Sequence, residues 1–140
     1  MFEAEKKIVY IGSDHLGHKL KGELKDYFDA HGFQFIDLGC FSKEECKYEM
    51  IAREVSEKVS EKGGEGGVGG VGILLAGNGV DACEEANKNK GIKAVCAHDE
   101  AGAEKARVEG KNVLGMDPGK TDFETAKKII SKFLGIGKGR

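Results

Sequence analysis

The sequence predicts an α/β fold in which a doubly wound parallel sheet of five strands has helices on both faces. Short apolar segments rich in Val, Ile and Leu alternate along the chain with segments whose apolar residues recur every three or four positions. This pattern is typical of buried strands separated by amphipathic helices. Right-handed crossovers place the helices on both faces of a parallel sheet, and we expect the strand order 2-1-3-4-5.

A single domain is expected over residues 1–140, because this is the length of one ordinary domain and the sequence shows no internal repeat and no domain boundary. The apolar runs predict strands, and the residues spaced three or four apart predict the helices between them. A run of glycines at 63–72 (GGEGGVGGVG) predicts a flexible loop at the far edge of the sheet. In chain order we expect strands at 7–13, 33–38, 73–76, 93–97 and 112–115, and helices at 16–28, 51–62, 80–88, 100–109 and 122–134.

The charge balance and the cysteines exclude several classes of protein. Lys and Arg number 22 against 24 Asp and Glu, so the chain has no strong field for nucleic acid or an anionic membrane. No apolar run approaches the ~20 residues of a spanning helix, and the start lacks the apolar stretch of a secretion signal. We therefore expect a cytoplasmic protein. The cysteines form no CxxC pair, which favours reduced thiols over a disulfide framework. The histidines are scattered without the spacing of zinc ligands.

Ligands of such folds bind outside the carboxyl ends of the strands, where the strand order reverses. The first and third strands flank that point in the predicted order, so Asp14, His15 and the loop 77–81 are expected to share one crevice. Asp14 and His15 offer a carboxylate and a titratable imidazole there. The alternative is structural, since Asp14 could simply cap the first helix while His15 stays a solvated turn residue.

The loop 77–81 combines features that favour an anion with features that oppose one. The turn Gly77-Asn78-Gly79 lets backbone amides approach a ligand and opens into a helix N-terminus, which suits an oxyanion. Asp81 lies in the first turn of that helix, however, and two glutamates follow it. These carboxylates can satisfy the helix dipole themselves and would repel a phosphate.

Three further readings of the residues stay open. Tyr48 in a polar loop could reach the crevice or cover a helix end, and Cys83 is more typical of a small buried residue than of a nucleophile. The spacing Gly77-x-Gly79-x-x-Ala82, with Asp99 about 20 residues on, also matches a dinucleotide fingerprint. The short helix and the position on the third strand weigh against that nucleotide-binding alternative.

Taken together, motifs spread over residues 7–135 resemble those of the ribose-5-phosphate isomerase B / galactose-6-phosphate isomerase family. Each motif is weak alone, and their order along the chain makes the combination specific. The motifs are Gly12-Ser-Asp14-His15-x-Gly17 with Leu20-Lys21, Asp37-x-Gly39 leading to Tyr48, Gly72-Ile-Leu-Leu-Ala-Gly-Asn-Gly79, Ala86-Asn87-Lys88, Gly91-Ile-Lys-Ala-Val95 and Asn112-Val-Leu114.

The resemblance implies a flavodoxin-like fold and the interconversion of aldose and ketose phosphates without a metal or other cofactor. It also implies a homodimer, or a dimer of such dimers, with active sites at the subunit interface. In this chemistry a base removes the proton beside a carbonyl, and a cis-enediol(ate) receives it back on the neighbouring carbon. Amides of the glycine-rich loop stabilise the developing oxyanion, and a separate acid/base opens the cyclic sugar.

The family's reactive positions are not all filled by matching residues. Its cysteine base falls on Ala76 and the glutamate base of another subset falls on Ala82, neither of which can accept a proton. Its ring-opening histidine falls near Glu109, and Arg140 is the one candidate for its C-terminal phosphate-binding arginines. The positions that do match are Asp14, His15, Tyr48, Gly77, Gly79 and Asn87, while Asn78 replaces a hydroxyl residue.

We therefore predict an isomerase that has relocated its base, with Asp81 as that base because it lies between the two lost positions. The alternative is a sugar-binding member without catalysis. The acidic loop and the few arginines suggest a small sugar or a sugar phosphate less anionic than a pentose phosphate. The predicted catalytic residues are Asp81, Asp14, His15 and Glu109, and the predicted binding residues are Asp14, His15, Tyr48, Gly77, Asn78, Gly79, Val80, Asp81, Asn87 and Arg140.

Overall fold

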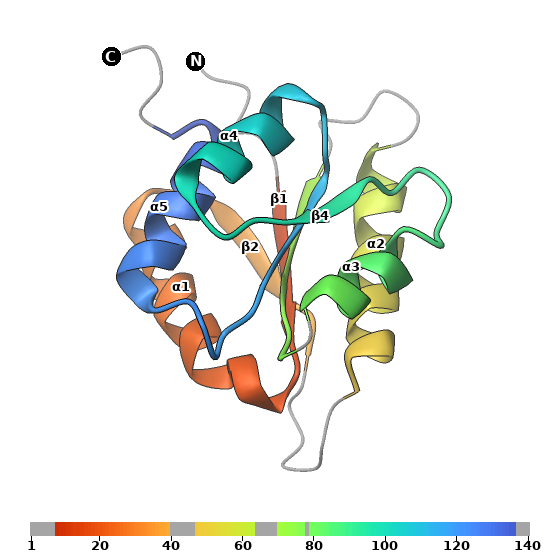
Figure 1. Cartoon of the computed structure of the whole chain (residues 1–140), viewed down its shortest axis with the longest axis horizontal. Helices are drawn as coiled ribbons and strands as arrows, with labels where there is room; N and C mark the ends of the chain where they lie inside the picture. Colours follow the sequence, from red (N-terminus) through yellow and green to blue (C-terminus); the bar gives the residue numbers. More distant parts are fainter. Residues whose placement is uncertain (1–7, 40–46, 64–69, 78, 137–140) are drawn as a thin grey trace.

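A parallel sheet forms the middle layer of the computed structural model, with helices packed on both of its faces (Figure 1). The structure describes residues 8–39, 47–63, 70–77 and 79–136. Within these ranges the fold class predicted from the sequence is confirmed, because strands and helices alternate and each neighbouring pair of strands is parallel. The strands are β1 (Ile8–Ser13), β2 (Gln34–Asp37), β3 (Gly70–Leu75), β4 (Ala94–Cys96) and β5 (Val113–Met116).

The strand order is β2-β1-β3-β5-β4, so the predicted order 2-1-3-4-5 is wrong for the last two strands. All four residues of β5 are buried, whereas two of the three residues of β4 are partly exposed. The fully buried strand β5 pairs with a neighbour on each side, and the shorter strand β4 takes the edge. The chain skips one place after β3 and returns to fill it with β5, whose Val113 lies opposite both Gly72 and Ala94.

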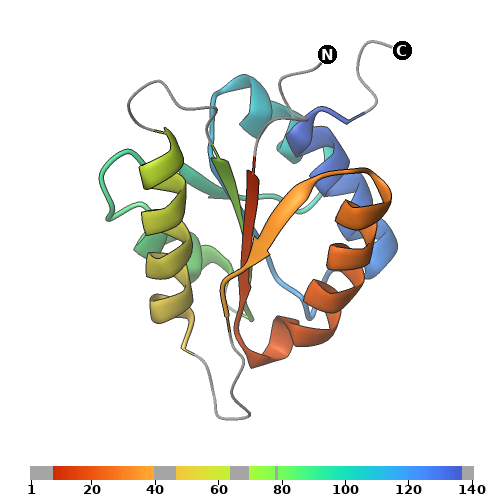
Figure 2. The same ribbon diagram turned by 180° about the vertical axis from the view of Figure 1, so that it is seen from behind.

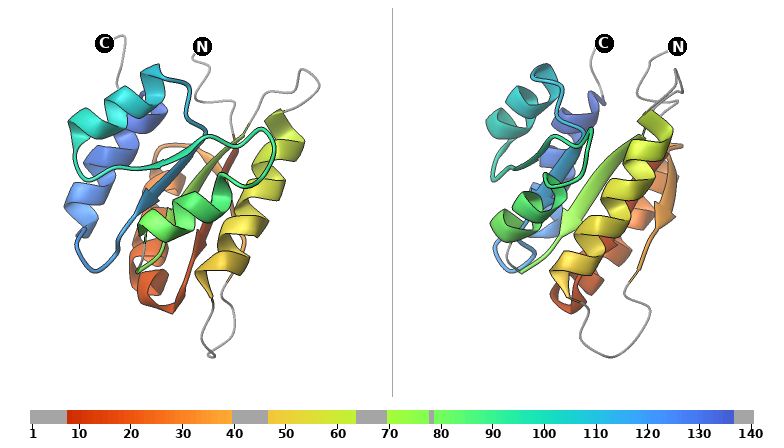
Figure 3. Two further views of the ribbon diagram at one scale, coloured as in Figure 1. Left: turned by 45° about the vertical axis from the view of Figure 1, so that its right-hand side comes forward. Right: turned by 90° about the vertical axis from the view of Figure 1, so that its right-hand side faces the viewer.

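The helices divide between the two faces of the sheet, as the doubly wound class requires (Figures 2 and 3). One face packs against α1, α4 and α5, and the other against α2 and α3. A short 3-10 helix, η2, joins β1 to α1. The helical segments are η2 (His15–Gly17), α1 (His18–Ala30), α2 (Tyr48–Gly63), α3 (Gly79–Ala86), α4 (Glu100–Val108) and α5 (Phe123–Leu134).

The glycine-rich stretch 63–72 is only partly the loop that the sequence predicts. Its last three residues open β3, a central strand, and residues 64–69 lie outside the described part. A Cβ on Gly72 would lie 2.5 Å from Val55 Cγ1 on α2. This glycine is therefore needed for the close approach of α2 to the sheet, and the prediction of a tolerant loop is wrong there.

None of the helices in the described ranges combines the length and the apolar character needed to cross a bilayer. The longest, α2, carries charged residues along its length.

Candidate functional site

The turns that follow β1 and β3 meet at the carboxyl edge of the sheet, which is the lower edge in Figure 1. One carboxylate joins them. Asp14 Oδ1 accepts hydrogen bonds from the backbone of Leu16 at 3.0 Å and Gly17 at 3.2 Å, and its Oδ2 accepts one from the backbone of Gly77 at 2.9 Å. The Asp14 amide also donates to the carbonyl of Leu75, at 3.1 Å. We call this arrangement the Asp14 clip.

Two glycines allow the two turns to approach so closely. A Cβ on Gly17 would lie 2.7 Å from the carbonyl oxygen of Leu75, a backbone atom that cannot move aside. A Cβ on Gly77 would collide with the side chain of Leu16, which covers this turn. The glycines of both motifs therefore serve close packing between the ends of β1 and β3, and the Gly77 amide is already used by the clip.

The other predicted residues of the crevice lie at the starts of helical segments on the same edge. His15 is exposed in η2, Val80 is exposed in the first turn of α3, and Gly79 opens α3 with Asp81 two residues later. Tyr48 is the first residue of α2, which packs beside α3 (Figure 3). Asn78 lies outside the described residues.

Tyr48 is held in a negatively charged environment. Partial desolvation raises the pKa of its phenol, and the negative charges of Glu49, Asp81 and Glu85 raise that pKa further. The hydroxyl therefore stays protonated over the working range of pH and can donate a hydrogen bond. The charge of Asp81 acts on the phenol, so the start of α2 and the first turn of α3 lie near each other.

The two positions where the resemblance places a base are buried and have no proton-accepting group. Ala76 follows β3, and Ala82 lies on the buried face of α3. Both belong to the core between α2, α3 and the sheet. Cys83 is buried as well, and its hydrogen bond with Cys96 together with burial raises the pKa of its thiol, which disfavours the thiolate. Asp81 is partly exposed at the start of the same helix.

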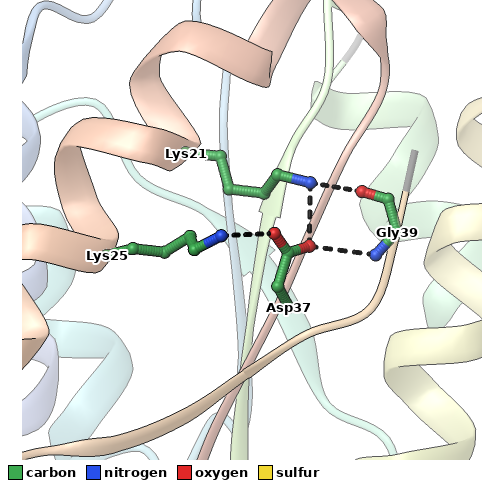
Figure 4. A network of polar contacts seen from close by, with 4 residues as sticks. All are labelled: Lys21, Lys25, Asp37 and Gly39. Carbon is green, nitrogen blue, oxygen red and sulfur yellow. Dashed lines mark hydrogen bonds and ion pairs between the residues drawn. The ribbon is translucent and has the colours of Figure 1, made fainter. Parts of the chain in front are cut away.

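A second polar network lies beside the clip and was not predicted from the sequence (Figure 4). The buried ammonium of Lys21 donates to Asp37 Oδ1 at 2.8 Å and to the carbonyl of Gly39, and Lys25 donates to Asp37 Oδ2 at 2.9 Å. Burial alone would raise the pKa of Asp37, but the hydrogen bonds from both lysines and from the Gly39 amide hold it below its ordinary value.

This Lys21–Asp37 network gives a structural reason for two of the sequence motifs. It fastens α1 to the carboxyl end of β2, and Gly39 donates its amide back to Asp37 at 3.1 Å. A signal for it was present in the sequence, because Lys21 stands three and seven residues before Leu24 and Phe28, on the face of α1 that turns to the sheet.

Two predicted residues are not brought to the crevice of their own chain. The side-chain amide of Asn87 is used at the other end of α3, where it accepts from the amide of Ala94 at 2.7 Å and donates to the Ala94 carbonyl at 3.0 Å. Glu109 is exposed at the end of α4, and the α4–β5 connection lies at the upper edge of Figure 1, opposite the clip. Arg140 lies outside the described residues.

The structure disfavours the dinucleotide fingerprint. In that motif the acidic residue follows the strand beside the glycine-rich turn. Here β5 lies between β3 and β4, so Asp99 is two strands away from the turn that follows β3. The Asp99 carboxylate instead caps α4 by accepting from the Gly102 amide at 2.8 Å. Among the residues that the structure describes, no three His, Cys, Asp or Glu side chains gather where a metal ion could be held.

The model of the Ribose/Galactose Isomerase family matches residues 9–138. Ribose-5-phosphate isomerase B of Escherichia coli is 37% identical over 131 residues, which cover 93% of this chain and 84% of the relative. Galactose-6-phosphate isomerase subunit LacB of Clostridium acetobutylicum is 29% identical over 91% of this chain and 71% of its own length.

Solved structures that resemble this chain are also ribose-5-phosphate isomerases. A ribose 5-phosphate isomerase from Thermotoga maritima superposes with a TM-score of 0.83 at 29% identity, covering 91% of this chain and 86% of that one. Ribose-5-phosphate isomerase B from Mycoplasma genitalium, with bound ribulose-5-phosphate, gives a TM-score of 0.83 at 30% identity, covering 91% and 82%.

Proposed function

Because the chain belongs to the ribose/galactose isomerase family, it is a sugar-phosphate isomerase, and we propose that it interconverts aldose and ketose through a cis-enediol(ate) in the crevice between the ends of β1 and β3. The observation that supports this site best is the Asp14 clip, which holds the turns after both strands against each other. A proton moves between neighbouring carbons in this reaction, so the crevice must supply a base, donors to the oxyanion and groups that fix the sugar.

Asp81 is the base in this proposal. It is the carboxylate in the first turn of α3, it is partly exposed, and its negative charge helps to raise the pKa of Tyr48. Ala76 and Ala82 are buried and without an acceptor, and Cys83 has its thiol engaged with Cys96. A carboxylate in the first turn of α3 can take the proton from one carbon and return it to the next.

Donors to the substrate come from the start of α3 and from the segments that face it. The first N–H groups of a helix have no acceptor within the helix, and those of Gly79 and Val80 are of this kind. We assign them, with Asn78, to the oxyanion. The exposed imidazole of His15 and the protonated phenol of Tyr48 are assigned to the hydroxyl groups of the sugar.

Glu109 can take part only if a second copy of the chain supplies it. It follows α4 at the edge of the sheet opposite Asp14, so the two residues cannot meet in one copy. Large apolar side chains are exposed beside the crevice: Leu16 (61%), Met50 (56%) and Val80 (54%). We therefore propose a homodimer, alone or paired with another, that covers this edge and brings Glu109 and Arg140 of one copy to the crevice of the other.

The charges around α3 orient the substrate. Asp81, Glu84 and Glu85 would repel a phosphate at the start of α3, so we place the reacting carbons there and the phosphate away from it. We also expect the protein to act in the cytoplasm, where charged sugar phosphates are retained.

The isomerisation is tested by solvent-deuterium incorporation into ribose 5-phosphate, ribulose 5-phosphate, galactose 6-phosphate and their unphosphorylated forms. We expect deuterium at the carbon beside the carbonyl for at least one phosphorylated sugar. Binding without exchange across the whole panel would support the non-catalytic alternative. Turnover of the best substrate then tests Asp81, since D81N should lower kcat at least ~100-fold. Glu57→Gln, which changes an exposed carboxylate on α2 that has no role in the proposed site, is the control and should keep kcat within about threefold of wild type.

The shared site is tested by mixing two variants. D81N and E109Q place their defects in different halves of each proposed site, so a mixed dimer has one intact site. After subunit exchange, an equal mixture should recover ~25% of wild-type activity, because half of the dimers carry one good site out of two. Recovery of no activity, or a monomer in sedimentation, would contradict the dimer while leaving the assignment of Asp81 to be judged by its own variant.

A further inference from the structure

Two cysteines that the isomerisation does not use lie in contact beneath the start of α3. The sulfur of Cys83, on α3, is 3.4 Å from the sulfur of Cys96, the last residue of β4, and both thiols are free. Cys83 is buried, whereas Cys96 is partly exposed at the carboxyl edge of the sheet. The pair therefore combines a buried cysteine with one that is partly exposed.

Gly115 leaves the room in which the sulfurs meet, and Gly79 lies over them. Gly115 of β5 lies opposite Cys96, and a Cβ there would be 2.5 Å from the sulfur of Cys83 and 3.3 Å from that of Cys96. A Cβ on Gly79, the first residue of α3, would lie 3.4 Å from the Cys96 sulfur. The dithiol thus fills a space bounded by β5, β4 and the first turn of α3.

We propose that Cys83 and Cys96 form a redox modification site that hydroperoxides convert to a disulfide. The two sulfurs are already within contact distance, and closing the bond to ~2.05 Å needs a movement of a little over 1 Å. Cys96 is the residue that meets the oxidant, because it is the less buried of the two and its hydrogen bond with Cys83 lowers the pKa of its thiol.

The oxidation proceeds in two balanced steps. The Cys96 thiolate attacks a hydroperoxide oxygen, so an S–O bond forms, the O–O bond breaks and an alcohol (water, for hydrogen peroxide) leaves after taking a proton. Cys83 then attacks the sulfenic sulfur, the S–S bond forms, and the hydroxyl group leaves as water with the proton of the Cys83 thiol. Two thiols lose two electrons in total, and the hydroperoxide accepts them.

The consequence for catalysis rests on the proposed function. Cys83 lies two residues after Asp81 on the short helix α3, whose first residue packs over Cys96. Drawing Cys83 toward β4 therefore moves the segment that carries the proposed base and the oxyanion donors. A misplacement of ~1 Å in a reacting geometry can lower a rate ~100-fold, and we expect the disulfide form to turn over at least ~10-fold more slowly.

Mass spectrometry of the full chain treated with hydrogen peroxide tests the site without reference to activity. Tryptic cleavage places Cys83 in peptide 63–88 and Cys96 in peptide 94–105. We expect these two peptides to be joined after oxidation, to separate on treatment with dithiothreitol, and to stay separate in C83A and C96A. The double variant C40S/C46S is the matched control and should still give the linked pair.

Several outcomes would overturn the proposal: Cys96 oxidised only to sulfinic acid, a link from Cys83 to Cys40 or Cys46, or no link at an excess of peroxide. Isomerase activity is then measured on the linked and reduced forms. A slower rate that dithiothreitol restores supports the coupling to α3, and an unchanged rate in the linked form contradicts it. A reduced protein with no isomerase activity would contradict the proposed function. The peptide map would still show whether Cys83 and Cys96 form a disulfide.

Discussion

The helices α1 and α3 both begin at the carboxyl edge of the sheet, but they are held there in different ways. On the α1 side, charged groups take part in the packing: Asp14 accepts from backbone amides in the clip, and Lys21 and Asp37 pair with each other. On the α3 side, small apolar residues such as Ala82 and Ala86 make the packing, and the carboxylates of Asp81 and Glu84 lie toward the outside. Charge therefore contributes to the packing beside α1, whereas beside α3 the carboxylates lie nearer the surface.

This difference indicates how the site keeps its shape without the bases that the resemblance implies. The motif residues that are present, Asp14, Lys21 and Asp37, hold backbone segments in place. The positions at which the family's bases are missing, Ala76 and Ala82, lie on the α3 side, where buried alanines pack well. The polar contacts of Asp14, Lys21 and Asp37 therefore do not depend on which residue of α3 carries a carboxylate, as the proposed role of Asp81 requires.

The largest effect on stability is expected from Lys21→Met, which breaks the Lys21–Asp37 network. The Lys21 side chain is 3% exposed and that of Lys25 is 37% exposed, although both donate to the same carboxylate. Removing the buried partner should lower the free energy of unfolding in urea by about 3 kcal/mol, whereas Lys25→Met should cost less than ~1 kcal/mol. Equal losses in the two variants would show that burial does not distinguish the two ion pairs.

A smaller effect is expected where the two regions meet, at the Asp14 clip. Asp14→Asn keeps an oxygen for the amides of η2 but turns an NH₂ group toward the Gly77 amide, so the bond between the turns is lost. The free energy of unfolding should fall by about 1.5–3 kcal/mol, the range for a hydrogen bond to a charged group. His15→Gln changes an exposed neighbour and should cost less than ~0.5 kcal/mol. If the two variants unfold alike in urea, Asp14 does not fasten the turns.

The pH dependence of stability separates the α1 side further. The pKa of Asp37 is lowered in the folded chain, so its contribution is complete above the unfolded-state value of ~3.9 and is lost as the pH falls through the folded-state value. Wild type should therefore lose more free energy of unfolding than Asp37→Asn between about pH 6 and pH 2. Parallel pH profiles for the two proteins would contradict a charged Asp37 in the network.

The smallest effect concerns the α3 side, where Tyr48 reports the local charge. Its pKa is raised partly by Asp81 and Glu85, so D81N and E85Q should each lower it, and Lys25→Met should leave it unchanged. The difference in tyrosinate absorbance between each protein and its Tyr48→Phe counterpart isolates this phenol. An unaltered titration in D81N would place Asp81 away from Tyr48 and weaken its assignment to the crevice.

Much of the fold follows from the sequence because buried parallel strands and amphipathic helices have different periods. The order of β4 and β5 did not follow, since both are short apolar runs and their places depend on which one is packed on both sides. The prediction of a loop over the whole stretch 63–72 was wrong at residues 70–72, which open β3. Glycines typical of a loop also occur where a helix approaches a strand closely, as Gly72 does beneath Val55.

The candidate site was predictable where one rule of topology applies. The ends of β1 and β3 meet, and the structure joins Asp14 to Gly77 there. The roles of Asp81, His15 and Tyr48 stay predictions. The contact between Cys83 and Cys96 could not be predicted, because it depends on the place of β4 in the sheet. The family resemblance groups Glu109 with residues at the opposite edge, because a resemblance between sequences does not show whether a residue reaches the site of its own chain.

The Asp14 clip also has a consequence for how the chain folds. Its hydrogen bond to Gly77 spans 63 positions in the sequence, and the two backbones it joins are neighbours only after β1 has paired with β3. Closing a contact between residues so far apart in the sequence costs chain entropy. The proposed sugar site therefore requires β1 and β3 to be paired in register, and we expect partly folded chains not to bind the substrate.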